Sequence, residues 1–167
     1  MLTNKVETKP IIQIDIEQWI PKESDLQFLD LKEFLYKEMI IKEAEFRALI
    51  DKKDWQLYSN RYTLLYVSNR AIIPQWAYLI IANKLKEVNS ICFMKTENYK
   101  EDILLYEIHA KDYSEFQGKR LLIKGCSREK LSLQPFILLA QKLTPIVKAL
   151  SFGESCSTVP LFKNENI

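Results

Sequence analysis

The chain has little histidine, glycine and cysteine: one, three and three residues of the 167. A single histidine, His109, leaves no second imidazole for a Cys-His or Ser-His-Asp arrangement, so conventional hydrolase chemistry is disfavoured. Three glycines do not build the Gly-rich loops that cradle phosphates, and neither a dinucleotide nor a nucleoside-triphosphate fingerprint is present. Three cysteines form an odd set, which favours reduced thiols over a disulfide framework.

An excess of one charge and a long apolar run are also missing. Lysine and arginine number 24 against 22 acidic residues, and the two signs are interspersed without a basic stripe, so nucleic acid is not an expected partner. No stretch approaches the roughly 20 apolar residues that span a bilayer, and residues 1–10 lack the apolar core of a secretory signal. We expect a cytoplasmic protein without membrane association.

Periodicity indicates a strand followed by a helix within residues 9–40. Ile12, Ile14 and Ile16 alternate with polar residues, which predicts a strand with one wet face. The apolar spacing after Asp30 predicts a helix that this aspartate caps and that extends to about Met39.

The rest of the sequence predicts a duplication. At a shift of 58 residues, positions 43–96 align with positions 101–154 without a gap and share nine identities in 54 positions. Each unit reads as a helix, an Asp-aromatic turn, a strand, a loop, an apolar helix and a second strand. The alternative is that two α/β units of ordinary composition align by chance.

These units predict an α/β fold. A strand, a crossover helix and a second strand form a right-handed parallel unit, so two copies predict a mainly parallel sheet with crossover helices, to which the N-terminal strand could add an edge. We expect one domain over residues 1–167, with a tail at 155–167.

Candidate site residues gather where the strands of this sheet end, because ligands collect beyond the carboxyl ends of parallel strands. Cys126 and Cys156 each follow a strand of the second unit, and neighbouring strands would bring their ends to within about 5 Å. The two thiols suit a metal ion, an iron-sulfur centre or a reversible dithiol pair. Lys124 and Arg128 flank Cys126 and favour its thiolate. The loops at this edge also supply candidate anion or partner contacts, namely Ser68, Asn69, Arg70, Ser127, Arg128, Ser157 and Thr158.

Each candidate has a structural alternative. Free cysteine is often buried as a small hydrophobe, which is the expected role of Cys92 and an open one for Cys126 and Cys156. Arg70 and Arg128 are equivalent in the two units and are equally typical of solvated loop charges. His109 is expected as a helix residue rather than a ligand.

Four strings carry a resemblance to a known family: DW at 54–55, IPQWAY at 73–78, KGCS at 124–127 and GESCSTVPLFK at 153–163. Together they resemble a bacterial family known as domain of unknown function 2480, over nearly the whole chain. The resemblance implies a cytoplasmic protein whose gene lies near genes for sulfur mobilisation and iron-sulfur cluster assembly. It also implies a further cysteine in many members where this chain has Val67. No activity comes with the family.

Three hypotheses of function follow, and the sequence favours a protein that is not an enzyme. The first is an accessory factor of iron-sulfur or thiol metabolism that uses Cys126 and Cys156, with a metal ion or an iron-sulfur centre as its conceivable cofactor and with protein partners in sulfur metabolism. The second is a homodimeric scaffold that associates through its apolar crossover helices. The third is an enzyme that binds a small anion between the two loops.

Overall fold

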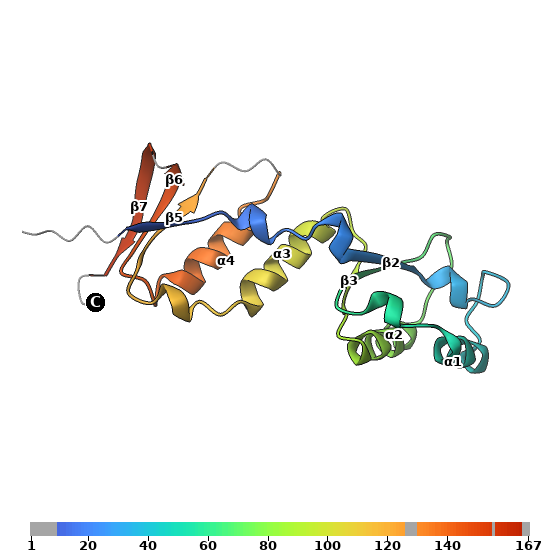
Figure 1. Ribbon diagram of the computed structural model, residues 1–167. Helices are drawn as coiled ribbons and strands as arrows, with labels where there is room; N and C mark the ends of the chain where they lie inside the picture. The colour runs from blue at the N-terminus through green and yellow to red at the C-terminus, as the bar shows by residue number, and fades with distance from the viewer. Residues whose placement is uncertain (1–9, 126–129, 155, 165–167) are drawn as a thin grey trace, which may run out of the picture. The chain divides into compact units, whose positions relative to one another are not determined.

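The structure, a computed structural model, describes residues 10–125, 130–154 and 156–164. The chain divides into two compact units (Figure 1). Unit 1 comprises Met1–Ile20 and Ile103–Ile167, and unit 2 comprises Pro21–Asp102. Unit 2 is therefore inserted in the sequence of unit 1, after Ile20 and before Ile103.

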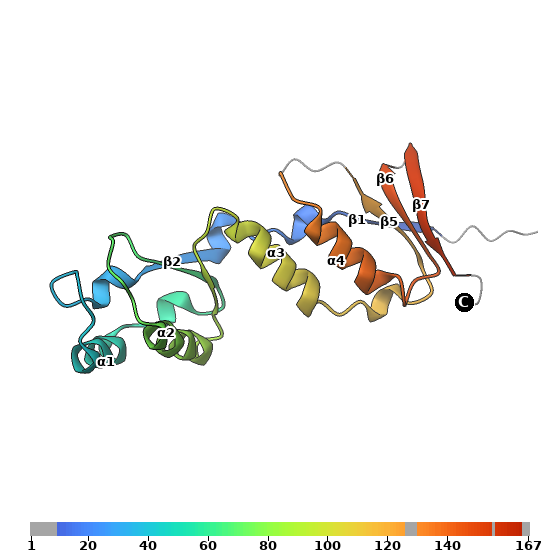
Figure 2. The same cartoon turned by 180° about the vertical axis from the view of Figure 1, so that it is seen from behind.

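Unit 2 is a three-stranded parallel sheet with its helices on one face. The strand order is β2-β3-β4, and both pairs are parallel. Helices α1 and α2 lie on the same side of the strands in both views (Figures 1 and 2), as right-handed crossovers between consecutive neighbours require. Its elements are the 3-10 helix η2 (Glu23–Asp25), β2 (Leu26–Asp30), the 3-10 helix η3 (Leu31–Phe34), α1 (Glu43–Lys52), η4 (Gln56–Tyr58), β3 (Tyr62–Tyr66), α2 (Gln75–Glu87) and β4 (Ile91–Met94).

Unit 1 repeats this plan and adds one strand. Its order is β1-β5-β6-β7, with the first three strands parallel and β7 antiparallel to β6. Its elements are β1 (Ile11–Ile14), η1 (Ile16–Trp19), the part of α3 (Tyr99–Ala110) from Ile103 onward, η5 (Ser114–Phe116), β5 (Arg120–Lys124), α4 (Gln134–Leu143), β6 (Ala149–Glu154) and β7 (Ser157–Lys163).

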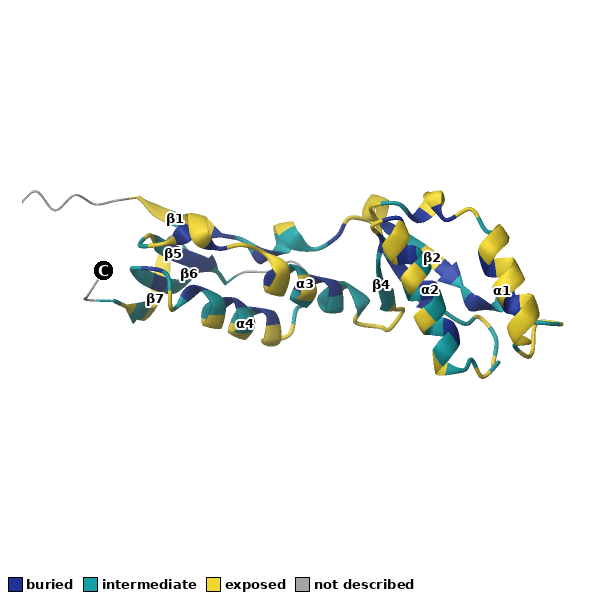
Figure 3. Ribbon diagram, turned by 90° about the horizontal axis from the view of Figure 1, so that it is seen from below, coloured by how far each residue is buried: buried dark blue, intermediate teal, exposed yellow. Residues whose placement is uncertain are grey.

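Each unit has its own apolar core between helices and sheet. In α2, Ala77, Ile81 and Leu85 recur every four residues and are fully buried, so they form one stripe of the helix. Leu139 and Leu143 form the same stripe in α4. Figure 3 shows these helices with one buried and one exposed side. The predicted α/β class with mainly parallel strands and crossover helices is confirmed.

The two units share hydrogen bonds at the 58-residue shift. The indole Nε1 of Trp55 donates to the carbonyl of Ile50 at 2.8 Å, and the hydroxyl of Tyr113 donates to the carbonyl of Ile108 at the same distance. Both acceptors belong to the helix that precedes the Asp-aromatic turn. The backbone at Asn60 and at Gly118, again 58 residues apart, has positive φ of 55° and 67°. These correspondences support the predicted duplication, which itself stays a prediction.

Three details differ from the sequence expectation. The strands form two sheets rather than one four-stranded sheet. The helix predicted from Asp30 to about Met39 is wrong: η3 ends at Phe34, and Lys37 and Glu38 have positive φ, which an α-helix does not allow. Leu31 and Phe34 are both buried, and their three-residue spacing fits a 3-10 turn as well as a helix. The predicted tail contains β7.

The hydrogen bond of Tyr113 gives a test of unit 1. Substitution Tyr113→Phe leaves the buried carbonyl of Ile108 without this donor, which costs about 1–3 kcal/mol. Burial also raises the pKa of Tyr113 from 10.0 to about 12. The unfolded chain loses this proton first, so the stability that the neutral phenol supplies is full below about pH 10 and is lost as the pH rises toward 12.

Urea unfolding of both proteins, followed by circular dichroism at about pH 8 and again near pH 11.5, measures both effects. We expect the difference between the two proteins to shrink at the higher pH. The matched control is Trp55→Phe, which removes the equivalent bond of unit 2 without removing a titrating group. If the free energy of unfolding depended equally on pH in the wild type and both variants, Tyr113 would not be the titrating group whose hydrogen bond stabilises unit 1.

Candidate functional site

The sequence predicts a thiol site at the carboxyl edge of unit 1. Strands β5 and β6 are neighbours, and Lys124 is paired with Gly153. The ladder continues one residue further, because the amide of Gly125 donates to the carbonyl of Gly153 at 3.2 Å. Cys126 itself lies outside the described residues. Cys156 is exposed and lies in the turn between β6 and β7.

Gly153 explains why this turn forms where it does. Its φ is +127°, and a side chain at this position would collide with the carbonyl oxygen of Ser157. Only glycine fits such a backbone without strain. Ser157 and Thr158 begin β7 directly after the turn, where Ser157 pairs with Glu154 and Thr158 with Gly153. Ser157 and Thr158 are both exposed. Of the other contacts predicted for this edge, Ser127 and Arg128 lie outside the described residues.

An ion pair that the sequence did not predict joins two strands at this edge. The Nζ of Lys124 lies 2.8 Å from Oδ2 of Asp15, and both side chains are less than one third exposed. The hydrogen bond to Asp15 raises the pKa of Lys124 above its ordinary value. Lys124 is thus engaged by a carboxylate, which offsets the positive potential that the sequence assigned to it beside Cys126. The residues are 109 positions apart, and the sequence signal is that each stands at the carboxyl end of a run of apolar residues.

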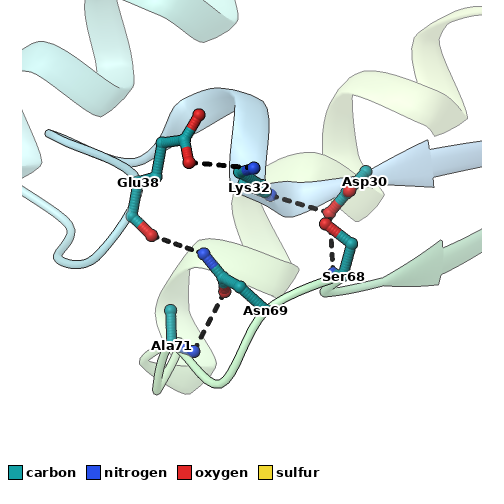
Figure 4. Close-up of polar contacts among 6 residues, drawn as sticks. All are labelled: Asp30, Lys32, Glu38, Ser68, Asn69 and Ala71. Carbon is teal, nitrogen blue, oxygen red and sulfur yellow. Dashed lines mark hydrogen bonds and ion pairs between the residues drawn. The ribbon is translucent and has the colours of Figure 1, made fainter.

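The equivalent edge of unit 2 is held together by Asp30 (Figure 4). Its Oδ1 accepts from the amide of Lys32 at 3.0 Å and from the amide of Ser68 at 3.1 Å, which ties the ends of β2 and β3. The partial burial of Asp30 raises its pKa, but the hydrogen bonds from Ser68 and Lys32 outweigh this effect, so the pKa lies below the ordinary 3.8.

Ser68, Asn69 and Arg70 therefore lie together at this edge with different surroundings. The side-chain amide of Asn69 donates to the carbonyl of Glu38, and its oxygen accepts from the amide of Ala71 at 3.0 Å (Figure 4). Arg70 is exposed. Polar groups of Ser68 and Asn69 are used within the chain, and the anion-binding role of these residues stays a prediction.

The remaining cysteine and histidine have ordinary positions. Cys92 is half-buried in β4 and packs against the core of unit 2, and burial raises the pKa of its thiol. His109 is exposed on α3. Within the described residues, no group of three or more His, Cys, Asp or Glu side chains could hold a metal ion.

A cavity that the sequence did not predict lies beside the same edge of unit 1. Its volume is about 580 Å³, and its walls include Phe136 and Ile137 of α4, Phe152 of β6 and Leu161 of β7. Gly125 also lines it, and a side chain there would meet the ring of Phe152 at 3.1 Å. The sequence signal for this cavity is the apolar residues of GESCSTVPLFK, which form β7 where the sequence predicts a tail.

The family is decided by a match over residues 1–164, nearly the entire chain, to the model described as protein of unknown function DUF2480. The chain belongs to the DUF2480 family. This confirms the resemblance of the sequence motifs, and the family brings no activity with it. No curated protein and no solved structure matches this DUF2480 chain. Among the described residues, no helix has the length and apolarity to cross a membrane.

Asp30 gives a test of the edge of unit 2. Substitution Asp30→Ala removes both the cap of η3 and the bond to Ser68, and we expect a loss of about 1–2 kcal/mol in the free energy of unfolding. Because the pKa of Asp30 is lowered on folding, this stability is present above about pH 4 and is lost as the pH falls through the lower, folded-state pKa. Urea unfolding at neutral and at acid pH measures it.

The matched control is Asp54→Ala, since Asp54 accepts a local bond from the amide of Gln56 but no bond from another strand. A loss for Asp30→Ala no larger than for Asp54→Ala would show that Asp30 does not tie the two strands.

Proposed function

We propose that this DUF2480 protein is an accessory factor of iron-sulfur or thiol metabolism, and that Cys126 and Cys156 form its working thiol pair. The observation that carries the proposal is the hydrogen bond from the amide of Gly125 to the carbonyl of Gly153 at 3.2 Å. Gly125 directly precedes Cys126, and Gly153 is three residues before Cys156. Adjacent strands thus lead into both cysteine-bearing segments.

The exposure of Cys156 also supports the proposal, because a thiol must reach solvent to meet a partner. Cys92 differs in this respect, since it is half-buried in β4. The duplicated plan strengthens the contrast: the position of unit 2 that corresponds to Cys126 is Ser68, whose backbone amide is bound to Asp30. We infer that the pair of edge thiols is a feature of unit 1 alone.

The donor set is incomplete for a resident metal. Structural zinc and iron-sulfur clusters usually take four protein ligands, whereas the pair supplies two and the described residues contribute no group of three ligands. We therefore propose that the pair acts as a contact for sulfur or for a partner protein. Within the described residues, further ligands for a metal would have to come from a second molecule.

Thiol reactivity tests this proposal. The protein is purified anaerobically, alkylated in the folded state and mapped by mass spectrometry, with zinc, iron and sulfide measured in parallel. We expect Cys126 and Cys156 to be modified at least about tenfold faster than Cys92, because burial raises the thiol pKa of Cys92 and the thiolate is the reactive form.

The matched variants are Cys126→Ser with Cys156→Ser, and Cys92→Ser as the control. Any zinc, iron or sulfide that co-purifies should vanish in the double variant and persist in the control. Slow alkylation of both edge thiols in the folded protein, together with an identical metal content in all variants, would overturn the proposal.

A second candidate function is a homodimeric scaffold, favoured by the exposed apolar side chains of the crossover helices. Leu79 of α2 is 66% exposed and Ile137 of α4 is 49% exposed, and apolar surface of this kind marks association sites when it is contiguous. This candidate predicts a dimer that light scattering detects across micromolar concentrations and that the double substitution Leu79→Asp, Ile137→Asp dissociates. A monomer throughout this range would exclude it.

A further inference from the structure

The cavity of unit 1 exists because β7 extends the sheet beyond α4. In unit 2 the sheet ends at β4. In unit 1, β7 adds a strand beside β6, and its Leu161 lines the same space as Ile137 of α4. The rings of Phe136 and Phe152 meet edge to face, with centroids 5.8 Å apart, and form an apolar wall of the cavity.

Apolar side chains are left open to solvent around this cavity. Leu133 is 74% exposed, Leu161 is 50% exposed and Ile137 is 49% exposed, although all three line one space. Scattered exposed leucines need no explanation, but a cluster around a hollow indicates a binding site.

One charged residue borders this apolar space. Of the ten described residues that line it, only Lys130 carries a charge. Lys130 is exposed, and it has no ion-pair or hydrogen-bond partner among the parts of the chain that the structure describes. The amino end of α4 lies at the same side of the cavity, because Leu133 precedes the helix and Phe136 belongs to its first turn. The helix dipole adds a smaller positive potential there.

The size of the cavity distinguishes between possible occupants. A volume of about 580 Å³ lies within the range of roughly 300–1,000 Å³ that small-molecule pockets occupy. A stable protein interface needs about 20–30 residues on each side, whereas ten described residues line this space. A small molecule therefore fits the cavity better than a partner helix or a second copy of the chain.

We propose that this cavity binds a small amphipathic anion, with an apolar chain or ring against Phe136, Phe152 and Leu161 and one carboxylate or similar group beside Lys130. The apolar walls supply the binding energy by removing the chain from water. The lysine selects an anionic headgroup over a neutral or cationic one. The proposal does not rest on the thiol function, because it is argued from the apolar walls and Lys130 without either cysteine.

Fluorescence displacement tests the proposal with the full chain. Anilinonaphthalene sulfonate, an aromatic anion, serves as the probe, and decanoate, decanol and decyltrimethylammonium compete for its site. We expect decanoate to displace the probe at least about tenfold more strongly than decanol, the scale of one charge-assisted hydrogen bond, and the cation to be the weakest competitor. The preference should weaken as salt is added.

Two substitutions separate the apolar and charged parts of the site. Lys130→Glu should remove the preference for decanoate and leave decanol binding unchanged. Ile137→Asp should abolish binding of both. The matched control is Leu79→Asp, because Leu79 occupies the corresponding position of α2 and is also exposed. Circular dichroism and thermal unfolding confirm that each variant is folded. The Cys126→Ser, Cys156→Ser variant should bind decanoate as the wild type does, which separates this site from the proposed thiol function.

Several outcomes would overturn the proposal. Equal displacement by decanoate and decanol would show that Lys130 selects no headgroup. Probe binding that Ile137→Asp leaves unchanged would place the probe elsewhere. Binding to anionic vesicles without binding of free decanoate would assign the surface to a membrane. A dimer that Ile137→Asp dissociates, without decanoate binding, would assign the cavity walls to a second copy of the chain.

Discussion

The parallel pairing of β5 with β6 is the constraint on which unit 1 depends. Backbone groups in a buried sheet must find partners, and a parallel pair needs a crossover that returns the chain to the same edge. Helix α4 makes this crossover, and its buried stripe at Leu139 and Leu143 holds it against the strands. The carboxyl ends of β5 and β6 are therefore adjacent, and the amide of Gly125 binds the carbonyl of Gly153. The cavity depends on the same pairing, since β7 extends the sheet beside β6 and supplies Leu161 to its lining.

Comparison of the two units shows which features are scaffold. Trp55 and Tyr113 hold the helix that precedes each Asp-aromatic turn through the same kind of hydrogen bond. Asp15 and Asp30 stand at the carboxyl end of the first strand of each unit, and each caps a 3-10 helix. The units then differ at their carboxyl edges: Asp30 binds the amide of Ser68 in unit 2, whereas Asp15 pairs with Lys124 in unit 1. The hairpin and the exposed thiol of Cys156 have no counterpart in unit 2, so specialisation is concentrated in unit 1.

The features predictable from the sequence were those with a strong local signal. The 58-residue shift located β3 and β5, because the middle residues of both strands are buried. The apolar runs located α2 and α4, because each helix buries one face. The helix after Asp30 was wrong, since Leu31 and Phe34 fit a 3-10 turn equally well and nothing nearby signals the positive φ of Lys37. The separation into two sheets was missed because strand pairing depends on long-range contacts, such as that of Ile14 with Ile123. For the same reason the local spacing of residues in the sequence does not predict the Asp15–Lys124 pair or the cavity beside β7.

The central claim is that the carboxyl edge of unit 1 brings two thiols together. A short bifunctional thiol reagent, applied to the folded protein and mapped by mass spectrometry, measures this most directly. The account predicts a link between Cys126 and Cys156 within one chain, formed under native conditions and lost in urea, with Cys92 left unmodified. Links that form only between chains, or that join either edge cysteine to Cys92, would contradict it.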